Sequence, residues 1–300
     1  MLLHPFSSYK ITRIRKPAPI REAMGILSTI VSRFPKRTGL PVFCFCALLF
    51  FGHCSSSHKS EKEIGNQFLF QAGDFQAIPG EKLEFEVEAG LFTVGDVSVE
   101  VIKPEEEIQK GRIHIVAKAS TRPGISWISR IQHLWHAWID STTGQSLRMT
   151  RDVTENKYHV EQDVRFLADS QMIVQRDLHR PERPPKYFPA PPGRMTDLVN
   201  MIWKIRYSPF DEKKPGDTLS YLSFFDGEWM VLQMRYAGLR PFGPKKSRES
   251  AFLLYPVNID SKLLRGKDPI EVWIENKPAR RPLRVMISSY VGNAGVFLRK

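Results

Sequence analysis

The stretch Leu83-Glu84-Phe85-Glu86-Val87-Glu88 decides the fold class, because apolar and acidic residues alternate in it without a break. Alternation with a period of two turns one face of a β-strand toward a core and the other toward water, as in antiparallel sheets. Residues 97–101 and 113–119 repeat this pattern. More strand-like runs follow at 133–140, 158–166, 171–177, 251–255, 270–275, 283–290 and 295–299. The pattern predicts a protein that is mainly β.

Asp226-Gly227 gives the sharpest local signal in the chain. It separates two strand-like runs, 219–225 and 228–236. Asp and Gly tolerate the positive φ angles of a type I′ turn, so this pair predicts a tight β-hairpin. The turn at Gly111 is expected to be looser.

One segment has helical spacing instead. Leu198, Met201 and Ile205 recur at that spacing behind Thr196, which can cap a helix, so residues 196–207 are predicted to be helical. The preceding residues 180–193 contain six prolines and are predicted to form an extended, largely unpaired loop. We favour one domain, an antiparallel sheet curled into a partial barrel or sandwich with the helix packed on it, because neither half offers enough strands to close a core.

The first 53 residues have the features of an export signal. A basic stretch ending at Arg37 precedes a mostly apolar run from Gly39 to Gly52. That run has the length of a secretory signal and is short of the ~20 residues that span a bilayer. Met24 lies just before this unit, so translation is predicted to begin there rather than at Met1.

Cys54 closes the apolar run and is followed at once by a Ser-rich polar stretch. This arrangement resembles a bacterial lipoprotein signal, which implies lipid on Cys54 and two or more acyl chains for stable membrane anchoring. We therefore expect a leader over 1–53, a polar tether over 54–79 and a folded domain over 80–300. A secretory peptide cleaved elsewhere and an uncleaved anchor are the alternatives.

Charge and cysteine content narrow the function classes. The formal net charge is +12, but residues 1–53 hold eight of the basic residues and one acid, which leaves 36 basic and 31 acidic residues in 54–300. A domain this mildly basic needs no nucleic-acid partner. Cys44, Cys46 and Cys54 are the three cysteines of the chain, so the folded domain has neither thiol catalysis nor a thiolate metal site.

Several short motifs occur together in one order. They are Gly80-Glu81-Lys82-Leu83-Glu84-Phe85-Glu86-Val87, Val94-Gly95, Trp138-Ile139-Asp140, Thr143-Gly144, Asp197-Leu198-Val199, Pro215-Gly216-Asp217, Val272-Trp273-Ile274-Glu275 and Arg281-Pro282-Leu283-Arg284. From about Gly80 to Lys300 the chain thereby resembles the domain of unknown function 3108, a family of exported bacterial proteins. The resemblance implies a β-rich envelope protein and brings no established reaction, cofactor or catalytic residue.

Candidate chemistry within the domain is sparse. His133, His136 and Asp140 would share one face of a helix and could hold Zn²⁺, but on a strand the two histidines point to opposite faces. We therefore predict no metal site and no cofactor. Asp140, Asp163 and Asp177 are scattered, and no nucleotide-binding or nucleophile motif occurs, so an enzyme is the less favoured class.

The Pro-rich loop is the candidate contact site. Its basic and aromatic residues could dock a lipid headgroup, an anionic glycan or a protein, or could belong to a solvated loop whose aromatic rings pack on the sheet. These residues are Arg180, Arg183, Lys186, Tyr187, Phe188 and Arg194. Trp127, Trp135 and Trp138 are close in sequence and are interpreted as core in preference to the lining of an apolar cavity.

The sequence thus favours a non-catalytic protein that is anchored by lipid in the bacterial cell envelope and binds an apolar or amphipathic envelope component. A structural or adaptor subunit that uses the Pro-rich loop is the first alternative, and an envelope hydrolase is the second. The expected partners are the membrane, through the lipid anchor, and a lipid or envelope protein, but not nucleic acid.

Overall fold

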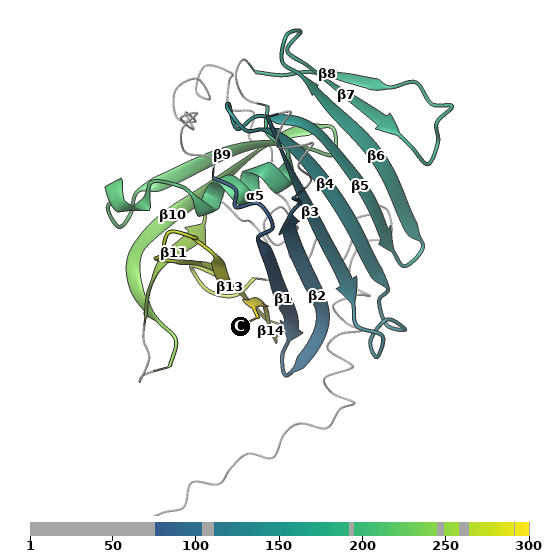
Figure 1. Ribbon diagram of the computed structural model, residues 1–300. Coiled ribbons are helices and arrows are strands. Elements are labelled where there is room, and N and C mark those ends of the chain that lie inside the picture. Colours follow the sequence, from purple (N-terminus) through teal and green to yellow (C-terminus); the bar gives the residue numbers. More distant parts are fainter. Residues whose placement is uncertain are drawn as a thin grey trace, which may run out of the picture. The chain divides into compact units, whose positions relative to one another are not determined.

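The computed structural model describes residues 76–103, 111–191, 195–244, 249–257, 264–290 and 292–299. These residues form fourteen strands, one α-helix and one short 3₁₀ helix (Figure 1). In chain order the elements are β1 (Lys82–Ala89), β2 (Phe92–Val101), β3 (Arg112–Thr121), β4 (Ile131–Asp140), β5 (Ser146–Glu155), β6 (Tyr158–Leu167), β7 (Met172–Asp177), β8 (Lys186–Pro189), α5 (Leu198–Arg206), η1 (Phe210–Glu212), β9 (Thr218–Phe225), β10 (Glu228–Phe242), β11 (Glu249–Pro256), β12 (Ile270–Glu275), β13 (Pro282–Ser289) and β14 (Gly292–Leu298).

All fourteen strands belong to one antiparallel sheet that does not close. Their order is β8-β7-β6-β5-β4-β3-β2-β1-β14-β13-β12-β11-β10-β9. The sheet therefore consists of two meanders, β1 to β8 and β9 to β14, which run from the centre of the sheet to its two edge strands. They are joined by β1 and β14, the first and last strands, which pair from Phe85↔Leu298 to Ala89↔Ala294. The predicted fold class, a mainly β protein with a curled antiparallel sheet and one helix, is confirmed.

Helix α5 lies on the inner face of the curled sheet and packs against both meanders. Leu198, Met201 and Ile205 join a cluster with β9 to β12. Val199 and Trp203 join a second cluster with β1 to β4. Among the helix residues, Ile202 keeps 44% of its surface exposed. Because two sides of the helix are covered by different parts of the sheet, its burial holds the curl together.

The N-terminus of α5 is fixed by a buried hydrogen-bond group. The Asp197 carboxylate accepts from the Asn200 backbone N–H at 3.0 Å and from the Ser146 hydroxyl at 2.6 Å. The Asn200 side chain donates in turn to the Gly144 carbonyl at 3.1 Å. The helix was predicted, but its N-cap is Asp197 and not Thr196. The Asp197 carboxylate accepts hydrogen bonds from both the first turn of the helix and Ser146 of β5.

The C-terminal end of α5 is held by Arg206, which is 1% exposed. Its guanidinium forms a two-bond ion pair with Glu81, at 2.7 and 3.1 Å. It also donates to the carbonyls of Ala279 and Arg280, at 2.8 and 3.1 Å. The chain segments before β1 and before β13 are thus tied to the same helix end.

The two edges of the sheet meet through side chains rather than through a ladder. Phe188 of β8 packs on Phe224 of β9, with ring centroids 5.1 Å apart, and the Trp229 indole donates to the Pro189 carbonyl at 3.0 Å. The prediction of a largely unpaired Pro-rich loop was therefore wrong for residues 186–189. They pair with β7 as an edge strand, a position where proline removes no ladder hydrogen bond.

The hairpin at Asp226-Gly227 is confirmed. Asp226 and Gly227 have φ angles of 53° and 89°, and β9 pairs with β10 from Phe225↔Glu228 outward. No α-helix in the described part of the chain is both long and apolar enough to span a bilayer.

Candidate functional site

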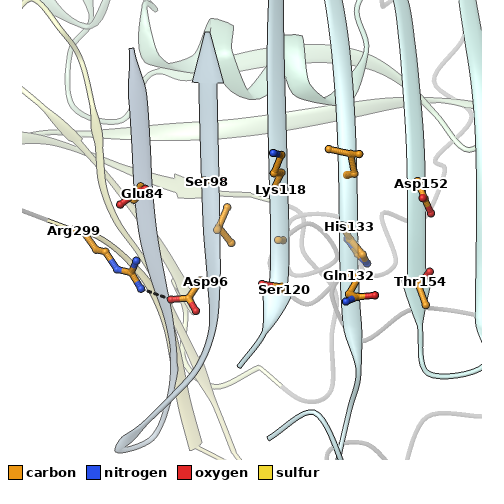
Figure 2. Close-up of a pocket in the computed structure, with 13 residues that line it drawn as sticks. Glu84, Asp96, Ser98, Lys118, Ser120, Gln132, His133, Asp152, Thr154 and Arg299 are labelled. Atoms are coloured by element: carbon orange, nitrogen blue, oxygen red, sulfur yellow. Dashed lines mark hydrogen bonds and ion pairs between the residues drawn. The ribbon is translucent and has the colours of Figure 1, made fainter. Parts of the chain in front are cut away.

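A groove of about 490 Å³ crosses the outer face of strands β1 to β5 (Figure 2). Alternate residues of these strands project into it, as the period of two requires. The side chains that line it are mostly polar: Glu84, Asp96, Ser98, Lys118, Ser120, Gln132, Leu134, Asp152, Thr154 and Arg299. Val97, Ala119 and His133 of the same strands, whose side chains point to the inner face, complete the lining. Such a lining suits a hydrophilic ligand rather than an acyl chain.

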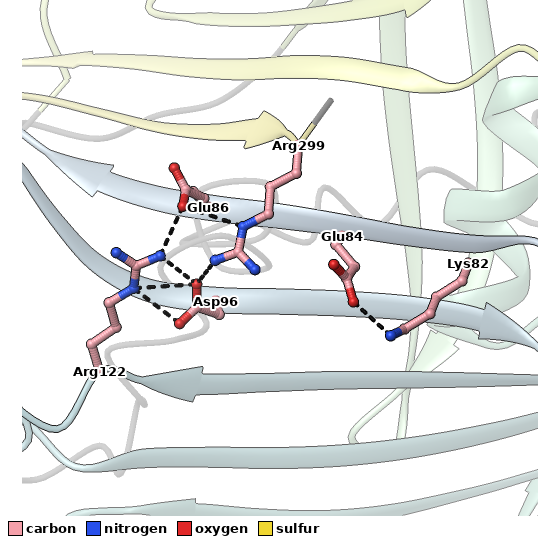
Figure 3. A network of polar contacts seen from close by, with 6 residues as sticks. All are labelled: Lys82, Glu84, Glu86, Asp96, Arg122 and Arg299. Atoms are coloured by element: carbon pink, nitrogen blue, oxygen red, sulfur yellow. Dashed lines mark hydrogen bonds and ion pairs between the residues drawn. The ribbon is translucent and has the colours of Figure 1, made fainter.

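Two arginines and two acids form an ion-pair network at one end of the groove (Figure 3). Arg122 lies 2.8 Å from both Glu86 and Asp96, and Arg299 pairs with the same two acids. Hydrogen bonding to Arg122 is the main cause that lowers the pKa of both acids. Because all four side chains are about one-third exposed, solvent screens the pairs, and the network orients the strand ends more than it stabilises them.

The other acids in the groove also have partners. Glu84 pairs with Lys82 at 2.6 Å, which lowers the pKa of Glu84, and Asp152 lies 3.0 Å from Nε2 of His159. A hydrolase needs a base or a nucleophile aimed at substrate. These acids are instead engaged with neighbouring basic side chains.

The inner face carries a buried arginine between two aromatic rings. Arg151 is 5% exposed, with its guanidinium carbon 5.6 Å from the Trp135 ring and 5.0 Å from the Phe225 ring. It donates to Gln162 at 2.8 Å and to Asp226 at 2.5 Å. A residue of β5 is thereby joined to the β9–β10 turn across the inside of the curl. No local pattern in the sequence indicates this contact, which joins residues 75 positions apart.

Further polar groups lie on the same face. His133 Nε2 is 2.7 Å from Oε1 of Glu155, which is 4% exposed. Within the described residues, Oε2 of Glu155, Oε1 of Gln175 and Oγ of Ser223 are buried without a hydrogen-bond partner. Buried polar atoms are nearly always satisfied, so these three atoms are exceptions in the described part of the fold.

Apolar side chains on the inner face are not fully covered. Trp135 packs against three separate core clusters and keeps part of its surface exposed. Val97 on β2, and Phe225 and Met230 at the β9–β10 hairpin, also face inward and remain partly exposed. The inner face therefore combines an accessible apolar wall with buried polar atoms.

The two histidines of β4 lie on opposite faces, as predicted. His133 faces inward, whereas His136 lies on the outer face with Nδ1 2.9 Å from Nε2 of His114. His114 stacks in turn on Trp138, with ring centroids 4.5 Å apart. Burial is the main cause that lowers the pKa of His136, with Lys118 and Arg148 acting in the same direction. In the described ranges no group of three or more His, Cys, Asp or Glu residues is placed to hold a metal ion.

The three tryptophans do not form one cluster. Trp127 is 70% exposed in the β3–β4 connection, Trp135 faces inward, and Trp138 lies on the outer face beside His114 and Arg148. The assignment of all three to the core was therefore wrong. Trp135 and Trp138 are separated by three positions on a strand and must point to opposite faces, while Trp127 precedes the strand.

The residues predicted for the Pro-rich loop divide into two groups. Arg180, Arg183, Lys186 and Tyr187 are exposed, and Arg183 lies 3.8 Å from Asp177. Phe188 instead packs on the opposite sheet edge, so its part is structural. Cys54 and Arg194 lie outside the described residues.

Comparison with known proteins adds a family but no activity. The family model described as "Protein of unknown function (DUF3108)" matches residues 84–299. None of the curated proteins matches the chain. A solved structure, the beta-barrel-like protein of domain of unknown function DUF1849 from Brucella abortus, is similar with a TM-score of 0.47 and 9% identity, over 75% of this chain and 98% of that one.

Proposed function

The chain belongs to the DUF3108 family of proteins of unknown function, and from this premise we propose that it is a non-catalytic, lipid-anchored protein of the bacterial cell envelope. In this proposal Cys54 carries the lipid, and the inner face of the curled sheet binds an apolar or amphipathic envelope component. The leader and the Ser-rich stretch after Cys54 support the location.

The observation that carries the binding function is the incomplete coverage of the inner face. Val97, Trp135 and Met230 face the helix side of the sheet, where packing is expected to remove apolar surface from water. They nevertheless remain partly exposed. An apolar ligand would cover that surface, at a gain of roughly 25 cal/mol for each Å² buried.

Polar atoms beside this wall favour an amphipathic ligand over a purely apolar one. Glu155, Gln175 and Ser223 each present a buried oxygen without a hydrogen-bond partner among the described residues. If side chains move on binding and uncover these oxygens, ligand hydroxyl or amide N–H groups would satisfy them and relieve a cost of about 1–3 kcal/mol for each atom. Ligands of this kind have a polar end and at least one hydrocarbon chain.

Native mass spectrometry of the full chain purified in a mild detergent tests the proposal directly. We expect a retained adduct with the mass of a lipid or another amphipathic molecule. A fluorescent fatty acid, 11-(dansylamino)undecanoic acid, should also bind the delipidated protein with a blue-shifted emission. Absence of both the adduct and the fluorescence change would refute the binding function.

Matched variants locate the site. Val97 and Ser98 are neighbours on β2 whose side chains project to the inner and outer faces, respectively. Val97→Gln should weaken binding of the dansyl fatty acid on the order of tenfold, because a polar amide replaces apolar wall, whereas Ser98→Gln should not. Met230→Gln gives a second inner-face variant. Equal affinities in all three variants would place the ligand elsewhere.

The adaptor alternative is supported by one observation. Tyr187 on the edge strand β8 is 62% exposed, beside the exposed Lys186 and close to Arg183 and Arg180. An aromatic ring flanked by basic residues on a sheet edge is a feature of protein interfaces. Retention of a protein subunit instead of a lipid in the same mass spectra would favour this alternative.

A further inference from the structure

Four neighbouring strand connections lie at one end of the strands, between the β7–β8 and β11–β12 connections. They join β1 to β2, β3 to β4, β5 to β6 and β13 to β14, and antiparallel pairing places their turns at the same strand ends. The β1–β2 turn lies at the end of these strands away from α5 (Figure 1). We call the described residues 90–92, 122–130, 156–158 and 289–290 the turn rim.

The turn rim carries the most exposed large hydrophobic side chains of the described chain. Leu91 is 87% exposed, Tyr290 is 72% exposed and Trp127 is 70% exposed. Phe92 and Tyr158 are also exposed, at 37% and 38%. These five side chains come from four turns that are far apart in sequence. The turns lie next to one another at the same end of the strands. Exposed apolar side chains gathered in this way mark an interaction surface.

The exposed charges of the turn rim are basic. Arg130 and Lys157 are exposed, and neither has an ion pair within the described residues. Arg122 is engaged with Glu86 and Asp96. Glu155, the last residue of β5, is buried against His133, and Glu88 lies within β1, two residues before the rim.

The polar group of Trp127 is already hydrogen-bonded within the protein. Its indole N–H already donates to the Gly124 carbonyl at 3.2 Å, within the same turn. The ring can therefore leave water without exposing an unsatisfied donor to hydrocarbon, which would cost several kcal/mol at the bilayer core. Tyrosine and tryptophan are favoured at the membrane–water interface because each combines an apolar ring with a polar group.

We propose that the turn rim docks on an anionic lipid surface, with Leu91, Trp127 and Tyr290 entering the headgroup region and Arg130 and Lys157 contacting lipid phosphates. Basic residues beside exposed aromatic and aliphatic tips suit such a surface, since both hydrophobic and electrostatic terms then favour binding. The inner face of the sheet is thereby brought to the membrane at the end opposite α5.

The lipid tether proposed above is compatible with this orientation. Gln76, the first described residue, lies beside α5, where its carbonyl accepts from Trp203 at 2.8 Å. Residues 55–75 separate it from Cys54. Twenty-one residues span up to ~70 Å when extended, whereas a ten-residue strand spans roughly 33 Å, so anchor and rim can reach the same bilayer.

A fluorophore on the turn rim tests docking without relying on the lipid anchor. The full chain would carry Cys44→Ser, Cys46→Ser and Cys54→Ser, with a single new cysteine from Leu91→Cys labelled with a nitrobenzoxadiazole dye. Vesicles of phosphatidylcholine, alone or with phosphatidylglycerol, would then be added. We expect a blue shift and a rise in emission that increase with the phosphatidylglycerol content.

Leu167→Cys provides the matched control. Leu167 is 42% exposed at the β6–β7 turn, which lies at the opposite strand ends, so dye attached there should not respond. Trp127→Ser should weaken the response at position 91 on the order of tenfold, by loss of buried apolar area. Arg130→Gln with Lys157→Gln should remove the preference for phosphatidylglycerol.

Equal signals at positions 91 and 167 would overturn the proposal, because the leader alone would then account for vesicle binding. No response at position 91 with either vesicle would also overturn it and would assign the turn rim to a protein partner. Since Cys54 is absent in this experiment, neither result bears on lipidation or on ligand binding at the inner face.

Discussion

Single residues connect the separate parts of the core. Trp135 contacts all three inner clusters, and Arg151 stacks against it while donating to Asp226 in the β9–β10 turn. An arginine buried in this way is tolerated because it donates to Gln162 and Asp226 and its flat guanidinium packs on aromatic rings. The wall proposed for ligand binding is thus also a structural junction.

Lys204 makes stability depend on pH. It is 8% exposed on α5, and burial lowers its pKa to about 8, although Asp197 acts in the opposite direction. The unfolded chain, with a lysine pKa of 10.5, binds more protons between these values, so the free energy of unfolding should rise with pH there. We expect a gain on the order of 2 kcal/mol from pH 8 to pH 10.

Urea unfolding at a series of pH values measures this gain. Lys204→Met should flatten the dependence, whereas Lys118→Met, on the exposed outer face, should leave it unchanged. The series stops near pH 10 because burial raises the pKa of Tyr221, whose ionisation would destabilise the fold at still higher pH. A Lys204→Met variant with the wild-type slope would contradict the assignment.

At the scale of elements, the family motifs explain how α5 is held. Gly144 and Asp197 belong to motifs that resemble the family, and they meet at the start of the helix. Glu81, in the opening motif, meets Arg206 at its end. Arg281, in the closing motif, forms a two-bond ion pair with Glu275 at 2.7 and 2.8 Å. These four motif residues therefore have structural roles.

The β9–β10 hairpin supports the second prediction. Gly227 has a φ of 89°, and a Cβ added there would lie 3.3 Å from Cζ of Phe188. Gly227→Val combines backbone strain of about 1–3 kcal/mol with crowding at the junction of the sheet edges. We expect the melting temperature to fall by several degrees in differential scanning calorimetry.

Gly124→Val is the control for that experiment. Gly124 lies in open space and does not adopt a positive φ. Gly111, in the turn expected to be looser, is not a suitable control, because its φ of 65° would strain valine there too. Equal melting temperatures for Gly227→Val and wild type would mean that the hairpin tolerates a β-branched residue.

At the scale of the whole molecule, the two faces of the sheet have different characters. The outer face of β1 to β5 carries ion pairs and a polar groove, while the inner face carries the apolar wall and α5. The same strands, β1 to β5, thus face water on the outer side of the sheet and the proposed ligand on the inner side. The turn rim adds a third surface, at the strand ends.

The location in the envelope leads to the last prediction. If Cys54 carries acyl chains, metabolic labelling with a clickable fatty acid should mark the wild-type protein in a bacterial host. Cys54→Ala should remove the label, while Cys44→Ala should keep it, because acylation follows the cysteine that closes the signal. Label that persists in Cys54→Ala would contradict the lipid anchor.

Local patterns in the sequence predicted most elements. Alternation predicted β1, β6, β7 and β12 nearly to the residue, and helical spacing predicted α5. Strand β5 was missed because its inward positions include Arg151 and Glu155, so apolar and polar residues do not alternate there. Strand β8 was missed because prolines normally interrupt pairing, and only its edge position permits them.

The sequence by itself determined the β class, the hairpin and the helix, because neighbouring side chains and local φ preferences govern these features. The tertiary structure decided which strands became neighbours and which residues met. Pairing of β1 with β14 and the contact of Arg151 with Asp226 join residues far apart in the chain. Such contacts depend on the packing of both meanders around α5, and no local pattern in the sequence encodes that arrangement.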